Sequence, residues 1–299
     1  MSDYTVSLVI RVGIEAFVAL SAYLLLLAGR ISFGQQGFFA LGAYAAGIAT
    51  ALWGAPLALG VGIGALAGAA AGALFATPMA RARGLYFAAG TLAFGELVRV
   101  ALLTFEYRLP IGPDLVGPAG ADGFRGIRAL FTSGVSMEVY GAGIWVLLAA
   151  VVAGLIALLR SRWGEAARML GDDEDAAAAL GVRAARVAAG TIVAAGALAG
   201  LGGGLFAHYA TYVEPGHADV MLGVHSLAYG LLGGLGTPLG PILGVALDIG
   251  VLESFRFLAG YRMIIFGGLV AVFLIARPRG IFDERMVRRL ARAVSPKQP

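Results

Sequence analysis

Two carboxylates, those of Glu96 and Asp248, lie within otherwise apolar stretches of the sequence and are the first candidates for a chemical role. An ionised side chain at the centre of a membrane helix costs about 2.5–3.5 kcal/mol on insertion scales, so it is retained where it is paired or hydrated. Arg99 follows Glu96 by three residues, so these two side chains can neutralise each other on one helix face. The alternative for either carboxylate is a polar lining of a translocation path, and for Asp248 path lining and packing fit equally well.

The sequence lacks the motifs that catalysis or nucleotide binding would need. Lys297 is the only lysine and precedes Gln298, so no GxxxxGK[ST] phosphate-binding loop exists. HExxH and GxSxG motifs are absent, there is no cysteine, and His208, His217 and His225 do not have a metal-ligand spacing. The absence of asparagine and of a TVGYG sequence removes the familiar pore signatures. We therefore expect a protein with no catalytic residues, cofactor or metal site; if ATP drives it, another chain hydrolyses the nucleotide.

The composition indicates a membrane protein. Of the 299 residues, 59% are hydrophobic and 13% are charged, and about 20 apolar residues suffice to cross a bilayer core ~30 Å thick. The clearest stretches of that kind are 8–28, 57–79, 84–104, 141–159, 187–211 and 262–276. Two more, 35–53 and 225–253, contain internal glycine or proline and are expected to be broken. The predicted fold is an all-α integral membrane protein with about eight membrane segments, some broken or re-entrant.

Arginines indicate how these segments are oriented. They concentrate at 81–83, at 160–186 and at 277–292, and the positive-inside rule makes those regions cytoplasmic. The Gly/Pro-rich connection 105–140 is then external. The stretch 225–253 must enter the membrane and leave on the same external side, turning at 233–238, with Asp248 near its external end.

Glycines recur every four residues in two of the long stretches. One series is Gly60, Gly64, Gly68 and Gly72, and the other is Gly196, Gly200 and Gly204. Each series forms a smooth helix face, which predicts close helix packing. An alternative is that these faces slide during gating.

The polar segment 160–186 is the longest interruption on the predicted cytoplasmic side. Its apolar residues fall at helical spacing, which predicts a short amphipathic helix: Ala166, Met169, Leu170, Ala177 and Leu180. The acids Asp172, Asp173, Glu174 and Asp175 are expected to face water. Four adjacent acids would be repelled by an anionic lipid surface. Docking onto a soluble protein therefore fits this helix better than lying on the membrane.

Glu165, Ala166 and Ala167, followed by Gly171, resemble the EAAxxxG core of the cytoplasmic coupling loop in permeases of ATP-binding cassette (ABC) importers. Four further stretches resemble the permease family of branched-chain amino-acid ABC importers, of the LivM type, in the order in which the family has them. They are 31–47, 83–99, 232–247 and 261–282. In the family a basic residue usually precedes the acidic run of the coupling loop, whereas Gly171 precedes it here.

The resemblance implies a transmembrane permease domain over 1–282, with the coupling loop at 160–186, and a short basic cytoplasmic tail at 283–299. It implies a multi-pass protein of the bacterial cytoplasmic membrane whose partners are a homologous second permease subunit, two ATPase subunits and a periplasmic substrate-binding protein, with no nucleic acid. The small-molecule substrate would be a branched-chain amino acid, although relatives also carry urea, short amides or aromatic acids. The implied ATPase-coupling residues are Glu165, Ala166, Ala167, Met169, Leu170, Gly171, Asp172, Leu180 and Gly181.

Candidate residues of the translocation path come from the interrupted segments and the membrane carboxylates. They are Gly34, Gly37, Gly42, Glu96, Gly234, Gly236, Pro238 and Asp248. Leucine at Gly42 or Gly236 is expected to block the path, whereas leucine at Gly68 is expected to harm assembly first. The rival interpretation is an ion-coupled secondary transporter with broken helices. Such a carrier needs no acidic helix projecting into the cytoplasm, so the segment 160–186 favours the ABC permease.

Overall fold

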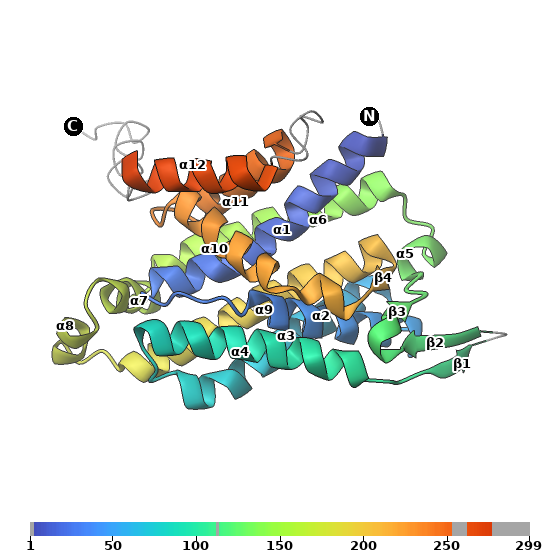
Figure 1. Ribbon diagram of the computed structural model, residues 1–299, viewed down its shortest axis with the longest axis horizontal. Coiled ribbons are helices and arrows are strands. Elements are labelled where there is room, and N and C mark those ends of the chain that lie inside the picture. Colours follow the sequence, from blue (N-terminus) through green and yellow to red (C-terminus); the bar gives the residue numbers. More distant parts are fainter. Residues whose placement is uncertain (1–2, 112–113, 253–261, 277–299) are drawn as a thin grey trace.

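The computed structural model describes residues 3–111, 114–252 and 262–276, and within them most of the chain is helical (Figure 1). Five described helices are long and apolar enough to cross a membrane: α1 (Asp3–Leu27), α3 (Leu57–Met79), α4 (Gly84–Thr104), α6 (Met137–Leu159) and α9 (Ala184–Ala210). Four shorter apolar helices join these five in the described bundle: α2 (Gln35–Ala51), α10 (Val220–Gly233), α11 (Leu239–Val245) and α12 (Arg262–Ala276). α11 continues into the π-helical turn η3 (Ala246–Leu252). The predicted all-α membrane fold is confirmed.

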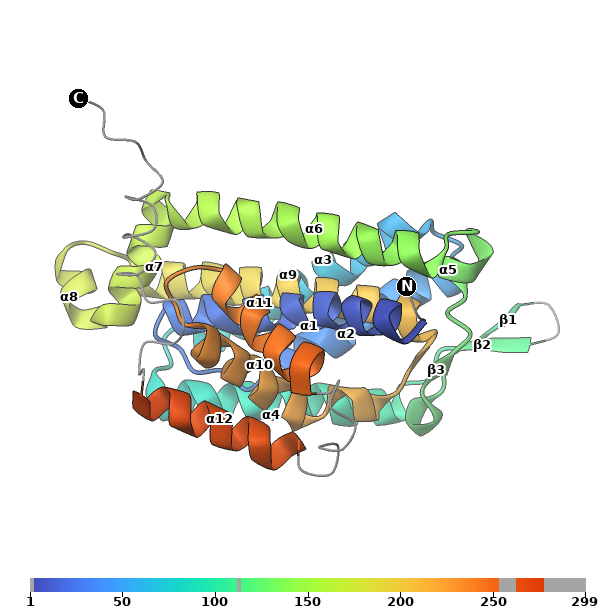
Figure 2. The same cartoon turned by 90° about the horizontal axis from the view of Figure 1, so that it is seen from above.

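The bundle has two distinct ends (Figures 1 and 2). One carries two short helices, α7 (Arg162–Asp172) and α8 (Glu174–Ala179). The other carries a small antiparallel sheet, which the sequence patterns did not indicate. Its strand order is β1 (Leu109–Ile111), β2 (Asp114–Pro118), β3 (Phe124–Arg125) and β4 (Tyr212–Val213). The short helices η1 (Gly120–Asp122), α5 (Ala129–Thr132) and η2 (Pro215–Ala218) lie at the same end. We call these the α7–α8 end and the sheet end. Pairing of β3 with β4 ties the 105–128 connection to the end of α9.

The helix α1 lies at the centre of the bundle. From Val12 to Ala28 every residue except Glu15 is buried, as expected for a helix that is apolar on all sides. Large apolar side chains of α3, α4 and α6, among them Leu66, Leu97 and Val146, are instead about 70% exposed (69%, 67% and 71%). An apolar outer surface of this kind suits lipid rather than water.

The two glycine series face each other. A Cβ on Gly68 would collide with the carbonyl of Gly196, and one on Gly200 would approach the Gly68 Cα to 2.9 Å. The backbones of α3 and α9 therefore touch, which confirms the predicted close packing.

The expectation that 35–53 is broken is wrong. α2 runs without interruption from Gln35 to Ala51, and the non-helical stretch, residues 28–34, precedes it. Glycine weakens a free helix, but a Cβ on Gly42 would collide with Gly200, and one on Gly47 would meet Phe124 at 2.7 Å. These glycines allow α2 to pack closely against other parts of the bundle and do not break the helix.

The predicted turn at 233–238 is confirmed. α10 ends at Gly233, Gly234 has φ +86°, and α11 begins at Leu239. The hydroxyl of Tyr23 donates to the carbonyl of Leu235 at 3.3 Å, which ties the turn to α1. α10 and α11 thus form a hairpin whose turn lies toward the α7–α8 end (Figure 2). The predicted segment 262–276 is α12, whereas the tail 283–299 lies outside the described residues.

Candidate functional site

The predicted coupling segment forms two helices, not one. Asp173, between α7 and α8, has an extended backbone, and its carboxylate accepts hydrogen bonds from the amides of Asp175 (2.9 Å) and Ala176 (3.0 Å). Aspartate is a preferred N-cap residue because it satisfies amides that have no partner within the helix. The chain therefore turns at Asp173 and starts α8 there.

The predicted coupling residues divide into a buried and an exposed group. Ala167 and Leu170 are buried against Ala28, Val187 and Ala188, and a Cβ on Gly171 would collide with the carbonyl of Leu27. Ala166 and Met169 are half-buried, whereas Glu165, Asp172, Leu180 and Gly181 are exposed. The buried group fixes the helix pair to the bundle, and the exposed group is free to meet another protein.

The placement of Leu180 corrects the predicted apolar face. Leu180 is 72% exposed, whereas Leu170 is 4% exposed. The break at Asp173 rotates α8 relative to α7, so spacing counted through one continuous helix does not apply to Leu180.

The acidic run does not simply face water, as the sequence analysis expected. Arg83, which precedes α4, contacts Glu174 at 3.0 Å and Asp175 at 3.1 Å. Arg30, in the connection between α1 and α2, lies 3.8 Å from Glu174. The start of α8 is thereby joined to two connections of the membrane bundle.

Arg30 is the buried member of this network. Its guanidinium donates to the carbonyl of Ala80 at 3.0 Å and to that of Ala82, and it lies 5.2 Å above the ring of Phe87. Burial lowers the pKa of Arg30 from its ordinary value, while the hydrogen bond to Asp175 and the charge of Glu174 raise the pKa of the exposed Arg83. Both remain cations at neutral pH.

Replacing Arg30 by methionine should destabilise the protein by about 2–3 kcal/mol, because it leaves the buried carbonyls of Ala80 and Ala82 without their donor. Arg83→Met is the matched control and should cost much less stability, since Arg83 forms ion pairs on the exposed surface. Thermal unfolding of the two variants in detergent measures the difference. Equal losses would contradict the conclusion that the buried hydrogen bonds of Arg30 to Ala80 and Ala82 stabilise the bundle.

The first three path candidates lie along α2 and the stretch before it. Gly34 packs on the carbonyl of Thr91, and Gly37 packs on Phe94 and Gly95 of α4. Gly42 packs on Gly200 of α9, which is also the neighbour of Gly68. The distinction expected between Gly42 and Gly68 therefore does not follow from their surroundings, since both are helix-packing positions.

Glu96 and Arg99 form the predicted pair on one face of α4. The Arg99 Nε donates to both carboxylate oxygens of Glu96, at 3.0 and 2.9 Å. The two side chains are 43% and 31% exposed, so the pair lies on the outer surface of this chain.

The remaining candidates belong to the hairpin. Gly234 and Pro238 are buried in its turn, and Gly236 is half-buried. Asp248 is buried and accepts a hydrogen bond of 2.7 Å from the Tyr229 hydroxyl. Gly244 packs on the backbone of Tyr229, so Asp248, four residues further along, lies toward the open end of the hairpin and away from its turn.

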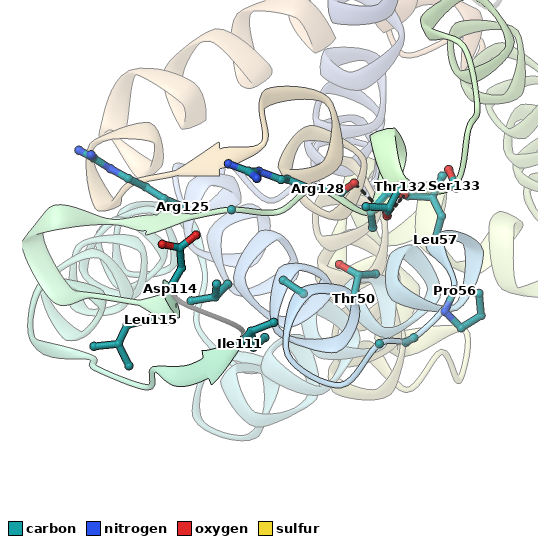
Figure 3. Close-up of a pocket in the computed structure, with 16 residues that line it drawn as sticks. Thr50, Pro56, Leu57, Ile111, Asp114, Leu115, Arg125, Arg128, Thr132 and Ser133 are labelled. Atoms are coloured by element: carbon teal, nitrogen blue, oxygen red, sulfur yellow. Dashed lines mark hydrogen bonds between the residues drawn. The ribbon is translucent and has the colours of Figure 1, made fainter.

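A pocket of about 660 Å³ opens at the sheet end (Figure 3). Its wall combines charged groups, Asp114, Arg125 and Arg128, with the hydroxyl groups of Thr50, Thr132 and Ser133. Apolar residues complete it, including Leu57, Ile111, Leu115 and Val116. Sequence patterns give no signal for this pocket, because strands and helix ends far apart in the chain form it.

Most of the chain resembles known permeases. A family model described as branched-chain amino acid transport system / permease component matches residues 4–276. The high-affinity branched-chain amino acid transport system permease protein LivM of Escherichia coli (strain K12) is 29% identical over a match 292 residues long, and the match covers 92% of this chain and 67% of that protein. LivM of Salmonella typhimurium is 30% identical with the same coverage.

A more distant relative covers half of the chain. The permease protein BraD of Pseudomonas aeruginosa, named for the same kind of transport system, is 30% identical over 151 residues, which are 49% of this chain and 48% of that protein. No solved structure matches the chain. The family match includes α7, α8 and every long helix described above. The chain therefore belongs to the family of branched-chain amino acid transport system permease components.

Proposed function

We propose that this chain is the transmembrane permease subunit of an ABC importer that moves branched-chain amino acids across the bacterial cytoplasmic membrane. The observation that carries the proposal is the family match over residues 4–276, which takes in both the membrane bundle and the α7–α8 pair. A second permease subunit, two ATPase subunits and a periplasmic binding protein complete the importer. The chain itself provides the path and the coupling surface.

The α7–α8 end faces the cytoplasm. Most of the described arginines near helix ends and in connections lie at this end: Arg30, Arg81, Arg83, Arg160, Arg162, Arg168, Arg183 and Arg186. The sheet end carries Arg108, Arg125 and Arg128. This asymmetry follows the positive-inside rule and supports a cytoplasmic carboxyl terminus and an external sheet.

The exposed tip of the α7–α8 pair docks onto an ATPase subunit. Its exposed residues include the acids Asp172 and Asp173 and the apolar Leu180. The acids can form ion pairs with the ATPase subunit, and Leu180 can be buried in a groove of that subunit. The tip is joined to the end of α1 by the buried Leu170, which packs near Ala28, and by Gly171, whose backbone lies against the carbonyl of Leu27. Movement of the ATPase is thereby passed to the membrane bundle.

The partners of the two membrane carboxylates support this proposal over the ion-coupled carrier. Glu96 is paired with Arg99, and Asp248 accepts a hydrogen bond from Tyr229. A coupling carboxylate has to release and bind a cation during each cycle, whereas the Glu96 carboxylate is already paired with the cation of Arg99 in the same chain.

Reconstitution tests the proposal. Proteoliposomes that contain this chain, its second permease and its ATPase subunits, supplied with the binding protein, should take up radiolabelled leucine only when ATP is present on the ATPase side. The purified chain alone should neither hydrolyse ATP nor take up leucine along a proton or sodium gradient. Gradient-driven uptake by the chain alone would establish the rival mechanism instead.

A further inference from the structure

One buried polar side chain is not explained by the contacts described so far. Gln36, in the first turn of α2, is 0% exposed, and neither its Nε2 nor its Oε1 has a hydrogen-bond partner within the described part of the chain. Leaving a buried amide unpaired destabilises a structure. A polar residue at such a place calls for a functional explanation.

The Gln36 amide lies between α4 and α10. A Cβ on Gly95 of α4 would collide with its Nε2, and a Cβ on Gly223 of α10 would lie 2.5 Å from its Oε1. Because both neighbours are glycine, no side chain at these positions separates the amide from the two helices. We call this contact of α2, α4 and α10 around Gln36 the Gln36 seam.

Backbone groups of complementary chemistry lie at the same seam. α2 begins at Gln35, and no side chain in the described part of the chain caps its N-terminus. The amide of Gly37 donates to the Gly34 carbonyl, and the other amides of this first turn provide donors and partial positive charge. The carbonyl oxygen of Phe33 would lie 2.6 Å from a Cβ on Gly223, beside the Gln36 amide. Donors for an anion and an acceptor for a cation are thus close together inside the bundle.

We propose that the Gln36 seam binds the α-carboxylate and α-ammonium groups of an amino acid during transport. The carboxylate is held by the α2 N-terminus and the Gln36 Nε2, and the ammonium by the Gln36 Oε1 and the Phe33 carbonyl. In this structure Gly95 and Gly223 cover the amide, so the site becomes accessible when α4 and α10 move apart. A bound amino acid then favours the open seam, because only in that state do the Gln36 amide and the charged groups of the amino acid find hydrogen-bond partners in each other. The inference rests on the proposed function and identifies where the solute is recognised.

A pair of substitutions separates binding from packing. Gln36→Leu removes two unpaired polar atoms at similar size, so the assembled complex should unfold at the wild-type temperature or above, while ATP-driven leucine uptake falls at least tenfold. Ser21→Ala is the matched control: the buried Ser21 hydroxyl in α1 also lacks a partner among the described residues, and its removal should leave uptake unchanged. Wild-type uptake by stable Gln36→Leu would overturn the proposal.

Cysteine labelling tests the site directly, and it still tests the proposal if the Gln36→Leu variant does not assemble. The native chain has no cysteine, so Gln36→Cys can be labelled alone. In the full importer it should react with a small water-soluble thiol reagent only when ATP is being hydrolysed, and added leucine should slow that reaction at least fivefold. Leucinamide, which lacks the carboxylate, should protect far less. The exposed Ala121→Cys is the positive control for reagent access.

The outcomes distinguish this inference from the proposed function. If the wild-type complex takes up no leucine with ATP, the proposed function fails. If the wild-type complex transports but Gln36→Cys stays unreactive while Ala121→Cys reacts, or if leucinamide protects as well as leucine, the Gln36 seam is not the carboxylate site.

Discussion

Replacing Gly68 by alanine is expected to prevent stable folding of the bundle. The added methyl group would collide with the Gly196 carbonyl and lie 2.9 Å from the Gly200 Cα. These obstacles are backbone atoms, which cannot rotate away, so α3 and α9 must separate along their length. Overpacking usually costs about 1–3 kcal/mol, and an immovable contact should reach the upper part of that range or exceed it. Expression and monodispersity in detergent measure the effect.

Gly62→Ala is the matched control in the same helix. An added Cβ on Gly62 has nothing within 4 Å, so this variant should gain about 0.5–1 kcal/mol from the higher helix propensity of alanine. Gly42→Ala should behave like Gly68→Ala, because it meets Gly200 from the side of α2. Equal stability of the variants at 62 and 68 would contradict the proposed contact between the glycine faces.

Aspartate substitutions at Leu170 and Leu180 should have opposite kinds of effect. Leu170 is 4% exposed in a cluster with Ala28 and Val187, so Leu170→Asp puts an unpaired charge into the joint between α7 and the bundle. We expect a loss of about 3 kcal/mol or more and little assembled protein. Thermal unfolding of the purified chain in detergent checks this result.

Leu180→Asp should leave the stability of the isolated chain within about 0.5 kcal/mol of wild type, because Leu180 is 72% exposed. In the full importer it should lower ATP-driven leucine uptake at least tenfold, since an apolar contact with the ATPase subunit is lost. Normal uptake by Leu180→Asp would show that the tip of α8 is not the coupling contact. A stable Leu170→Asp variant would contradict the assignment of the buried face.

The long helices and their packing faces follow from local features of the sequence. Runs of about 20 apolar residues can satisfy their backbone in lipid only as helices, and α1, α3, α4, α6 and α9 lie where such runs predicted them. Small residues at a period of four lie on one helix face. A turn between α10 and α11 was also predictable, because glycines and a proline interrupt an apolar run there.

Contacts between residues distant in sequence were decided only by the tertiary structure. Spacing along a helix states which residues share a face but not what that face meets, so the pairing of Gly68 with Gly196 and the uninterrupted α2 required the packed bundle. The ion pair between Arg83 and Glu174 joins separate connections of the chain. In the sequence Gln36 is an ordinary polar residue. In the structure its amide is buried with no hydrogen-bond partner among the described residues, because α4 and α10 cover it with glycines.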